Sequence, residues 1–351
     1  MGTTGSNGPP RSVTIHDVAE SAGVSIATVS RVINQNPTVA PELTERVLRS
    51  ISATGFVPNH SGRALRRQVS DVFAAIVSDS QNSFFTTLVA GMEEVAAANG
   101  LSVMLSNTNE DLVRERQVIQ AALGHRMAGV VIAVASETKS DLAPLIDAAV
   151  PTVLVDRKIA RYAGDSVLVD NRLAGQLAAE HLLSQGYSRP AVVTGPSYVS
   201  TSAERLRGFR SAMKSHGVRL PRAYVRSGAL RADQAEIAVH ALLDGDEPPD
   251  SLFAINSPMA AGAFRALRSR GVRLPDDFGL VGMDDDVWMQ VVEPAVTVVT
   301  QPVREIGRAA AELLLARRDD PQRPGVSIVL SPTLVERDSA SRHTPRSGSP
   351  A

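Results

Sequence analysis

The segment that decides the fold lies near the N-terminus of the 351-residue chain and reads TIHDVAESAGVSIATVSRVIN from Thr14 to Asn34. Thr14 and Asp17 have the spacing of a capping box, which marks the start of a helix. Gly23 ends this helix, and Ser25 can cap a second helix directly after it. Apolar residues recur three or four positions apart on one face of each helix: Ile15, Val18, Ala19 and Ala22, and then Val29, Val32 and Ile33.

A third helix is expected to complete this small unit. Pro41 suits the first turn of a helix, and Gly55 suits the position just after its end. Ala40, which precedes Pro41, offers no side-chain cap. We predict an all-α domain over residues 13–57, in which the third helix turns four apolar residues inward: Leu43, Val47, Leu48 and Ile51.

The outward face of the second helix fits the major groove of DNA. It has small residues at its N-terminal end and one long cation, Arg31. Small side chains allow close approach, and an arginine can bind O6 and N7 of a guanine together. Residues 1–70 carry seven arginines against four acidic residues, although the whole chain has a net charge of −1. A basic N-terminal segment attached to an acidic remainder of the chain indicates DNA binding. The periodicity of the helices alone also fits a helical hairpin whose arginine is merely exposed to solvent.

From Asp71 the pattern changes to alternating strands and helices. The strand candidates are short, continuous and apolar, as in parallel sheets covered on both faces: Val72–Ser78, Leu101–Ser106, Gly129–Ala135, Pro151–Val155, Ala191–Thr194, Leu252–Ile255 and Leu280–Gly282. Helices are predicted between them: Thr86–Asn99, Leu112–Leu123, Ala174–Gln185, Glu204–His216, Ala232–Leu243 and Met259–Arg270. Because these strands are too many for one simple sheet, we expect two doubly wound α/β lobes.

Three segments are expected to lack stable structure of their own. Residues 1–12 and 340–351 are rich in small and polar residues and have little to bury. Residues 58–70 form a linker, because the stretch from His60 to Arg67 is short, basic and nearly without apolar residues. An isolated helix of that length is marginal, so we interpret it as a hinge that folds only against a partner.

The composition disfavours several classes of protein. The chain has no cysteine, which excludes disulfide frameworks, thiolate zinc sites and cysteine nucleophiles. It has no P-loop, HExxH or GxSxG motif, and its seven histidines do not pair at metal-ligand spacing. We therefore expect no enzyme, no metal site and no cofactor. No apolar run is long enough to span a membrane and no signal sequence is visible, so a soluble cytoplasmic protein is expected.

Residues 13–67 resemble, nearly position by position, the headpiece of the lactose-repressor/galactose-repressor (LacI/GalR) family. The matching motifs are Asp17-Val18-Ala19, Ala22-Gly23-Val24-Ser25, Thr28–Asn34, Pro58-Asn59 and Arg63–Arg66. The resemblance implies that the start of the second helix reads bases and that a leucine of the hinge helix wedges into a central base step of the minor groove. The DNA-binding residues that it implies are Thr14, Ser25, Ile26, Ala27, Thr28, Ser30, Arg31, Asn34, Asn59, Arg63, Leu65 and Arg66.

The resemblance continues through residue 339 and implies a periplasmic-binding-protein-like core of two lobes joined by three crossovers. The first lobe is expected to comprise about residues 71–164 and 296–325, and the second about residues 165–295 and 326–339. The crossovers are placed near Ala163–Val167, Pro294–Thr297 and Gly325–Ser327.

A small-molecule effector is expected between the lobes, where the strands of open α/β sheets end. Asp156, Asn256 and Asp284 each follow a predicted strand. An Asp in that place is often only a helix cap or turn residue, and phenylalanines are often core. Taken together and in this order along the chain, the candidate residues favour a binding site. The resemblance implies these effector-binding residues: Asn82, Phe84, Phe85, Asp156, Thr201, Arg205, Asn256, Asp284 and Gln301.

Four positions depart from the family pattern. Ala40 stands where a Ser or Thr cap is usual, and Gly62 stands inside the hinge helix where Ala is usual, at a cost of about 0.5–1 kcal/mol. Ser257 replaces the Asp that usually follows Asn256. Leu230 occupies a position at which sugar-binding members can carry a stacking aromatic residue. The last two departures weaken the assignment of a sugar as the effector.

The sequence thus predicts a homodimeric transcription regulator, in the first place a repressor. Its affinity for a palindromic operator in double-stranded DNA is expected to depend on an effector, a sugar or another small metabolite. A dimer is favoured over a tetramer because the C-terminal stretch has no leucine heptad. Two alternatives stay open, a small-molecule-binding protein without DNA function and a DNA-binding protein without an effector.

Overall fold

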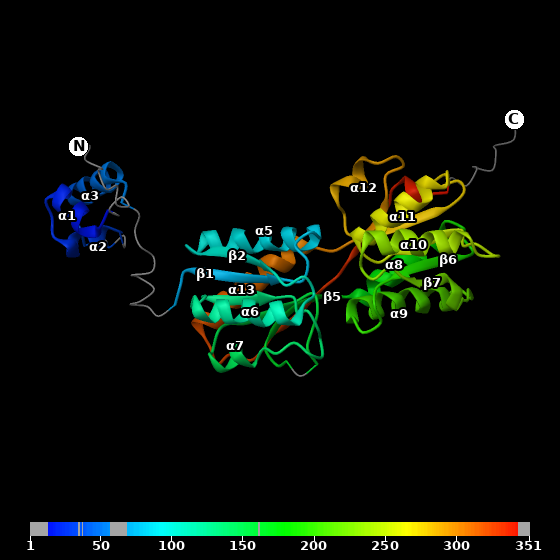
Figure 1. Ribbon diagram of the computed structural model, residues 1–351, viewed down its shortest axis with the longest axis horizontal. Coiled ribbons are helices and arrows are strands. Elements are labelled where there is room, and N and C mark those ends of the chain that lie inside the picture. Colours follow the sequence, from blue (N-terminus) through cyan, green and yellow to red (C-terminus); the bar gives the residue numbers. More distant parts are fainter. Residues whose placement is uncertain (1–12, 34–35, 37, 57–68, 161, 343–351) are drawn as a thin grey trace, which may run out of the picture. The chain divides into compact units, whose positions relative to one another are not determined.

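The computed structural model describes residues 13–33, 36, 38–56, 69–160 and 162–342 (Figure 1). The chain separates into two compact units, Met1–Ser70 and Asp71–Ala351. The predicted DNA-binding residues Asn34, Asn59, Arg63, Leu65 and Arg66 lie outside the described residues, as do most of the predicted linker, residues 1–12 and residues 343–351. The predicted start of the disordered tail at residue 340 was wrong, because Ala340 is buried at the end of a 3-10 turn.

The N-terminal unit contains three helices, α1 (Ile15–Ala22), α2 (Ile26–Ile33) and α3 (Pro41–Thr54). The capping box of α1 is confirmed, because the Thr14 N–H donates to Oδ2 of Asp17 at 2.7 Å and the Asp17 N–H donates to Thr14 Oγ1 at 3.4 Å. Ser25 Oγ accepts from the Thr28 N–H at 3.1 Å and so holds the start of α2. As predicted, α3 has Pro41 in its first turn and no side-chain cap from Ala40.

The core of this unit forms where the three helices meet. It includes Val18, Val29, Val32 and Val47, as the apolar spacing predicted. The prediction for Leu48 was wrong, since its side chain is 54% exposed. The next inward position of α3 is instead Ser50, whose hydroxyl is buried and donates to the Val18 carbonyl oxygen at 3.3 Å.

The second unit contains two six-stranded sheets. The first sheet is parallel throughout and runs in the order β11 (Ser327–Leu330), β5 (Asp165–Val169), β4 (Thr152–Val155), β3 (Gly129–Ile132), β1 (Val72–Val77), β2 (Ser102–Asn107). The second runs in the order β12 (Thr333–Val335), β10 (Thr297–Thr300), β9 (Gly279–Met283), β8 (Ser251–Ala254), β6 (Pro190–Thr194), β7 (Val225–Ser227), and only β10 and β12 pair antiparallel. We call the part built on each sheet the first and the second lobe.

Helices cover both sheets. In β1, Phe73 and Ala75 face one core cluster while Ala74 and Ile76 face another, as the alternation of a strand buried on both faces requires. The helices of the first lobe are α5 (Ser83–Ala98), α6 (Leu112–Gly124), α7 (Ala143–Asp147) and α13 (Val303–Asp319). Those of the second are α8 (Asn171–Ser184), α9 (Ser200–Ser215), α10 (Ala232–Leu243), α11 (Ser257–Ser269) and α12 (Val287–Val291), with the short 3-10 turns η1 (Arg222–Tyr224) and η2 (Asp338–Ala340).

The chain passes between the lobes three times, but not at the predicted points. β5 belongs to the first sheet, so the first crossover follows Val169 instead of lying at Ala163–Val167. β10 belongs to the second sheet and β11 to the first, so the other two crossovers follow Thr300 and Leu330 rather than lying near Pro294–Thr297 and Gly325–Ser327. The predicted lobe boundaries at residues 164, 295 and 325 therefore move by about five residues each.

Candidate functional site

All nine predicted effector-binding residues line one pocket of the second unit. Both lobes contribute, and most of the residues lie at or just beyond the carboxyl ends of strands. The pocket has a volume of about 60 Å³, which is room for a few water molecules and far below the ~300 Å³ of a typical small-molecule site. The structure adds five lining residues to the predicted set: Ser78, Asp79, Glu110, Arg157 and Leu230.

Two carboxylates mark equivalent places in the two lobes. Asp156 follows β4 and Asp284 follows β9. β4 is the third strand of the first sheet counted from β11, and β9 is the third strand of the second sheet counted from β12. Both residues have a positive φ, 63° and 68°. Of the eight non-glycine residues with positive φ in the described ranges, four line this pocket: Glu110, Asp156, Leu230 and Asp284. Backbone strain of this kind persists where the surrounding structure holds it, and it gathers at binding sites.

Arg205 of α9 is one of two buried cations that line the pocket. Its Nε donates to Oδ1 of Asn171 at 2.8 Å, and its Nη1 donates to the Ile255 carbonyl oxygen at 2.6 Å. Burial lowers the pKa of this guanidinium, while the charges of Asp284 and Asp156 act in the opposite direction. The two hydrogen bonds fix the side chain, and its positive charge acts on both carboxylates.

A second arginine of the pocket, Arg157, forms an ion pair within the first lobe. Arg157 is buried and donates twice to the carboxylate of Glu110, with both distances 2.6 Å. Its pKa is raised by this hydrogen-bonded pairing and by the charge of Asp156, against the effect of burial. Glu110 lies in the loop after β2, beyond the predicted strand Leu101–Ser106, and it was not among the predicted site residues.

Asn82 and Asn256 serve both the pocket and a helix. Asn82 Oδ1 accepts from the Phe84 N–H at 3.1 Å at the start of α5, and Asn256 Oδ1 accepts from the Met259 N–H at 2.9 Å at the start of α11. Asn256 also donates from Nδ2 to the Leu230 carbonyl oxygen at 3.2 Å. The capping interpretation and the pocket-lining interpretation therefore hold together for these residues.

Asp284 is the most deeply buried carboxylate of the pocket. Burial raises its pKa to about 6, although the charge of Arg205 and a hydrogen bond from Gln301 both lower it. Gln301 Nε2 donates to Asp284 Oδ1 at 2.6 Å from the second crossover. The pKa of Asp156 is also raised, first by burial, while the nearby arginines lower it. Burial in the pocket thus disfavours the charged forms of both carboxylates.

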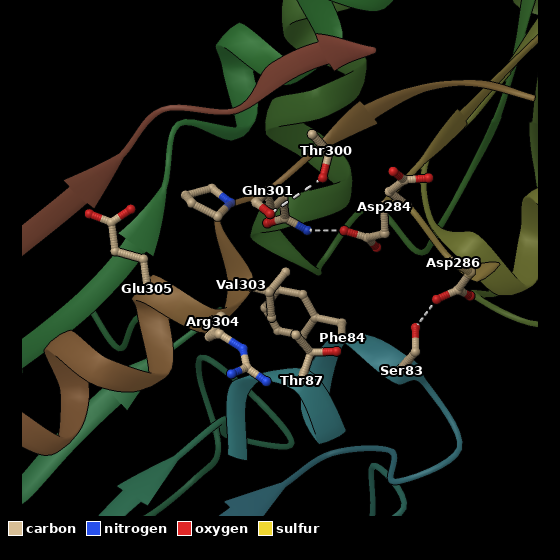
Figure 2. Close-up of a pocket in the computed structure, with 12 residues that line it drawn as sticks. Ser83, Phe84, Thr87, Asp284, Asp286, Thr300, Gln301, Val303, Arg304 and Glu305 are labelled. Atoms are coloured by element: carbon tan, nitrogen blue, oxygen red, sulfur yellow. Dashed lines mark hydrogen bonds between the residues drawn. The ribbon is translucent and has the colours of Figure 1, made fainter. Parts of the chain in front are cut away.

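A second cavity, of about 420 Å³, adjoins the pocket (Figure 2). Phe84, Asp284 and Gln301 line both cavities, so the two meet at these side chains. On the far wall Ser83 of α5 donates from its hydroxyl to Asp286, a contact between the lobes that Figure 2 shows.

Asp284 is expected to make the second unit less stable as the pH rises from about 4 to about 6. Its pKa in the folded chain, about 6, lies above the ordinary value of 3.8, so the folded state binds more protons in this interval. The stability from this group is fully present below the ordinary pKa and is lost as the pH rises through the folded one, up to about 3 kcal/mol. Urea unfolding between pH 4 and 8 measures this loss.

The control is Asp284→Asn, which keeps an oxygen that can accept from Gln301 but cannot titrate. It should flatten this part of the stability profile relative to the natural protein. A stability difference between the two proteins that stays constant from pH 4 to 8 would show that Asp284 does not titrate in this range.

The predicted DNA-reading face of α2 lies at the surface of the N-terminal unit. Ser25, Ile26, Ala27 and Arg31 are exposed, and Ile26 is 44% exposed although it is a large apolar residue. Thr14, Thr28 and Ser30 are half-buried. The opposite face of α2 packs into the core through Val29 and Val32. This helix therefore presents small residues and one cation outward while its other face holds it in place.

Among the described residues, no helix is long and apolar enough to cross a membrane. In the same part of the chain, no group of three or more His, Cys, Asp or Glu side chains could hold a metal ion.

Comparison with known proteins matches both units. Residues 14–59 match the bacterial regulatory proteins of the lacI family, and residues 179–340 match the periplasmic binding protein-like domain. The HTH-type transcriptional regulator GalR of Escherichia coli (strain K12) is 32% identical over 328 residues, which cover 93% of this chain and 96% of that protein.

Two solved structures extend the likeness to the fold. The transcriptional regulator CelR–cellobiose complex is 30% identical with a TM-score of 0.71, and the match covers 93% of this chain and 99% of that one. The lac repressor dimer bound to operator and the anti-inducer ONPF is 25% identical with a TM-score of 0.82, covering 95% and 100%. With this similarity over nearly the whole length, the chain belongs to the lacI family of bacterial regulatory proteins and is a DNA-binding transcriptional regulator.

Proposed function

We propose that the protein is a repressor and that the pocket between its lobes binds a small hydroxylated effector. Binding of this effector would control the affinity of the protein for its operator. The observation that carries the proposal is the convergence of all nine predicted residues on one pocket. The carboxylates of Asp156 and Asp284 accept hydrogen bonds, and the buried Ser78 hydroxyl that lines the pocket has no partner among the described residues. Such a lining suits a ligand rich in hydroxyl groups. The solved structure of the relative CelR is a complex with the sugar cellobiose.

The volume of the pocket sets a condition on binding. A cavity of about 60 Å³ cannot hold a sugar, so the lobes must separate to admit the effector and close around it. An effector that prefers one degree of closure shifts the population of the two lobe arrangements, and it changes operator affinity only by that preference.

For the N-terminal unit we propose that α2 lies in the major groove. Ile26, Ala27 and Arg31 would contact base edges, while Ser25 and Thr28 at the start of the helix would bind phosphate. Thr14 and Ser30 would lie at the same DNA surface. Asn34, Asn59, Arg63, Leu65 and Arg66, outside the described residues, keep the roles that the sequence predicts for them.

We further propose that two copies of the chain bind a palindromic operator in the bacterial cytoplasm. Exposed apolar side chains suited to a dimer interface occur on the edge strand β2 (Met104 and Leu105) and on α12 (Val287 and Val291). The lac repressor, a relative, is a dimer on its operator. A two-fold protein reads a two-fold site, so the operator should be a palindrome. We infer a regulator without enzymatic activity.

The experiment that tests this function is selection of operator sequences from random duplex DNA with the full-length protein. The salt concentration is fixed, because non-specific affinity falls steeply as salt rises. An enriched palindrome supports the proposal, and its genomic neighbours then suggest effectors for release assays. If no sequence is enriched, with or without a pooled metabolite extract, the proposed operator recognition is wrong.

Arg31→Ala is expected to cost about 1–3 kcal/mol of binding free energy at the selected operator and to relax the preference at one base position. The loss follows from removing a bidentate contact to a base. Binding titrations on the operator and on variants at each position measure it. The matched control is Arg49→Ala, which removes an exposed arginine of α3 in the same unit. An equal loss on every sequence would make Arg31 a phosphate contact instead.

A further inference from the structure

Asp286 joins the two lobes at the second cavity, which adjoins the effector pocket (Figure 2). Its carboxylate, which follows β9 in the second lobe, accepts from the hydroxyl of Ser83, the first residue of α5 in the first lobe. The same carboxylate accepts from the hydroxyl of Ser257, the first residue of α11 in the second lobe. One acidic side chain therefore ties together the starts of two helices that belong to different lobes.

Glu137 makes a reciprocal contact elsewhere between the lobes. It follows β3 in the first lobe, and its Oε1 accepts from the backbone N–H of Ser200, the first residue of α9 in the second lobe, at 2.7 Å. The residue before α9 is Val199, which provides no side-chain cap. The first N–H groups of a helix need partners and carry partial positive charge. The first lobe thus supplies the cap that α9 lacks.

Each serine in these contacts is adjacent in sequence to a residue that lines the pocket. Ser83 follows Asn82, Ser257 follows Asn256, and Ser200 precedes Thr201, and all three neighbours line the pocket. We propose that Asp286 and Glu137 are positioning residues that hold the lobes closed around the effector pocket. This proposal rests on the proposed function for its role in regulation, but the contacts themselves need neither DNA nor effector.

The two contacts should set how often the lobes open. Because the pocket is too small for an effector while these contacts are made, they stabilise the empty closed arrangement and oppose the entry of an effector. A hydrogen bond to a charged group changes an equilibrium by about tenfold or more. Removing either carboxylate should therefore raise the open population about tenfold.

Hydrogen exchange of the full-length protein, without DNA or effector, measures this opening. In Asp286→Ala, amides at the start of α5 and at the start of α9 should exchange about tenfold faster, although neither helix carries the substitution. In Glu137→Ala the same two regions should respond. Asp286→Asn and Glu137→Gln, which keep an acceptor oxygen in place, should restore most of the protection.

The matched control is Asp277→Asn, which removes an exposed carboxylate of the second lobe that binds Arg273 within that lobe. It should leave both helix starts as they are in the natural protein. If faster exchange in Asp286→Ala is confined to residues 284–288 and the start of α11, and Glu137→Ala affects only the loop after β3, the proposal is overturned. Thermal unfolding of each variant shows that it is folded.

Operator titration separates this proposal from the proposed function. Faster exchange at both helix starts with unchanged operator affinity would leave the lobe contacts established and contradict the link between closure and DNA binding. Unchanged exchange would overturn the proposal for Asp286 and Glu137 whatever the operator affinity of the variants.

Discussion

Replacing Gly175 by alanine is expected to lower the free energy of unfolding of the second unit by more than about 4 kcal/mol, an exceptional loss for one methyl group. Gly175 lies in α8, where an added Cβ would stand 1.8 Å from the carbonyl oxygen of Arg205 in α9. The clash is with backbone, so no side-chain rotation relieves it. The two helices would have to separate, and Arg205 would move with α9. Urea unfolding followed by circular dichroism measures the loss.

The matched control is Gly124→Ala. Gly124 is also helical, at the end of α6, but an added Cβ there has no neighbour within 4 Å. Alanine favours a helix over glycine by up to about 1 kcal/mol, so this variant should be unchanged or slightly more stable. Gly208→Ala should resemble Gly175→Ala, because its Cβ would stand 1.8 Å from the Arg172 carbonyl oxygen. A loss below about 1 kcal/mol in both α8 and α9 would mean that the helices are less closely packed.

The sequence predicted the α/β pattern because most strands are buried on both faces and therefore continuously apolar. Several short strands with polar residues escaped this signal, among them β7, β11 and β12, although the edge strand β2 was predicted. β5 begins with Asp165 and Ser166, and the buried carboxylate of Asp165 binds Arg317, which lies far along the chain, at 3.0 Å. Leaving out β5, β10 and β11 displaced the crossovers. α13 was also not predicted, although Ile306, Ala310, Leu313 and Leu314 have helical spacing.

The residues that line the pocket were predicted more completely than the strands and crossovers around it. Carboxylates after strands gave a local signal, and the family resemblance supplied residues such as Asn82 and Gln301 that have no such signal. Glu110 could not be found, because its role depends on Arg157 of a different loop. The contacts of Asp286 and Glu137 likewise join segments far apart in sequence, so only the folded chain shows them.

Arg205→Ala is expected to cost about 3–5 kcal/mol of stability at pH 8, because it leaves the buried carboxylate of Asp284 without its cation, while Asp156 keeps its ion pair with Arg157 at 3.4 Å. Arg205 itself is 5% exposed. Its charge lowers the pKa of both Asp156 and Asp284, so removing it raises both pKa values further. Protonation at lower pH then relieves the unpaired charges. The cost should therefore shrink as the pH falls from 8 to 5, which urea unfolding at the two pH values measures.

The matched control lies two residues further along the same helix. Arg207 is 58% exposed and pairs with Glu204, so Arg207→Ala should change stability by less than about 1 kcal/mol at either pH. Arg205→Lys keeps the charge but cannot reproduce both hydrogen bonds, to Asn171 and to the Ile255 carbonyl oxygen. It should fall between the natural protein and Arg205→Ala and show the weaker pH dependence. A cost for Arg205→Ala that is equal at pH 5 and pH 8 would mean that Arg205 stabilises the pocket by packing and hydrogen bonding, and not by balancing the charges of Asp156 and Asp284.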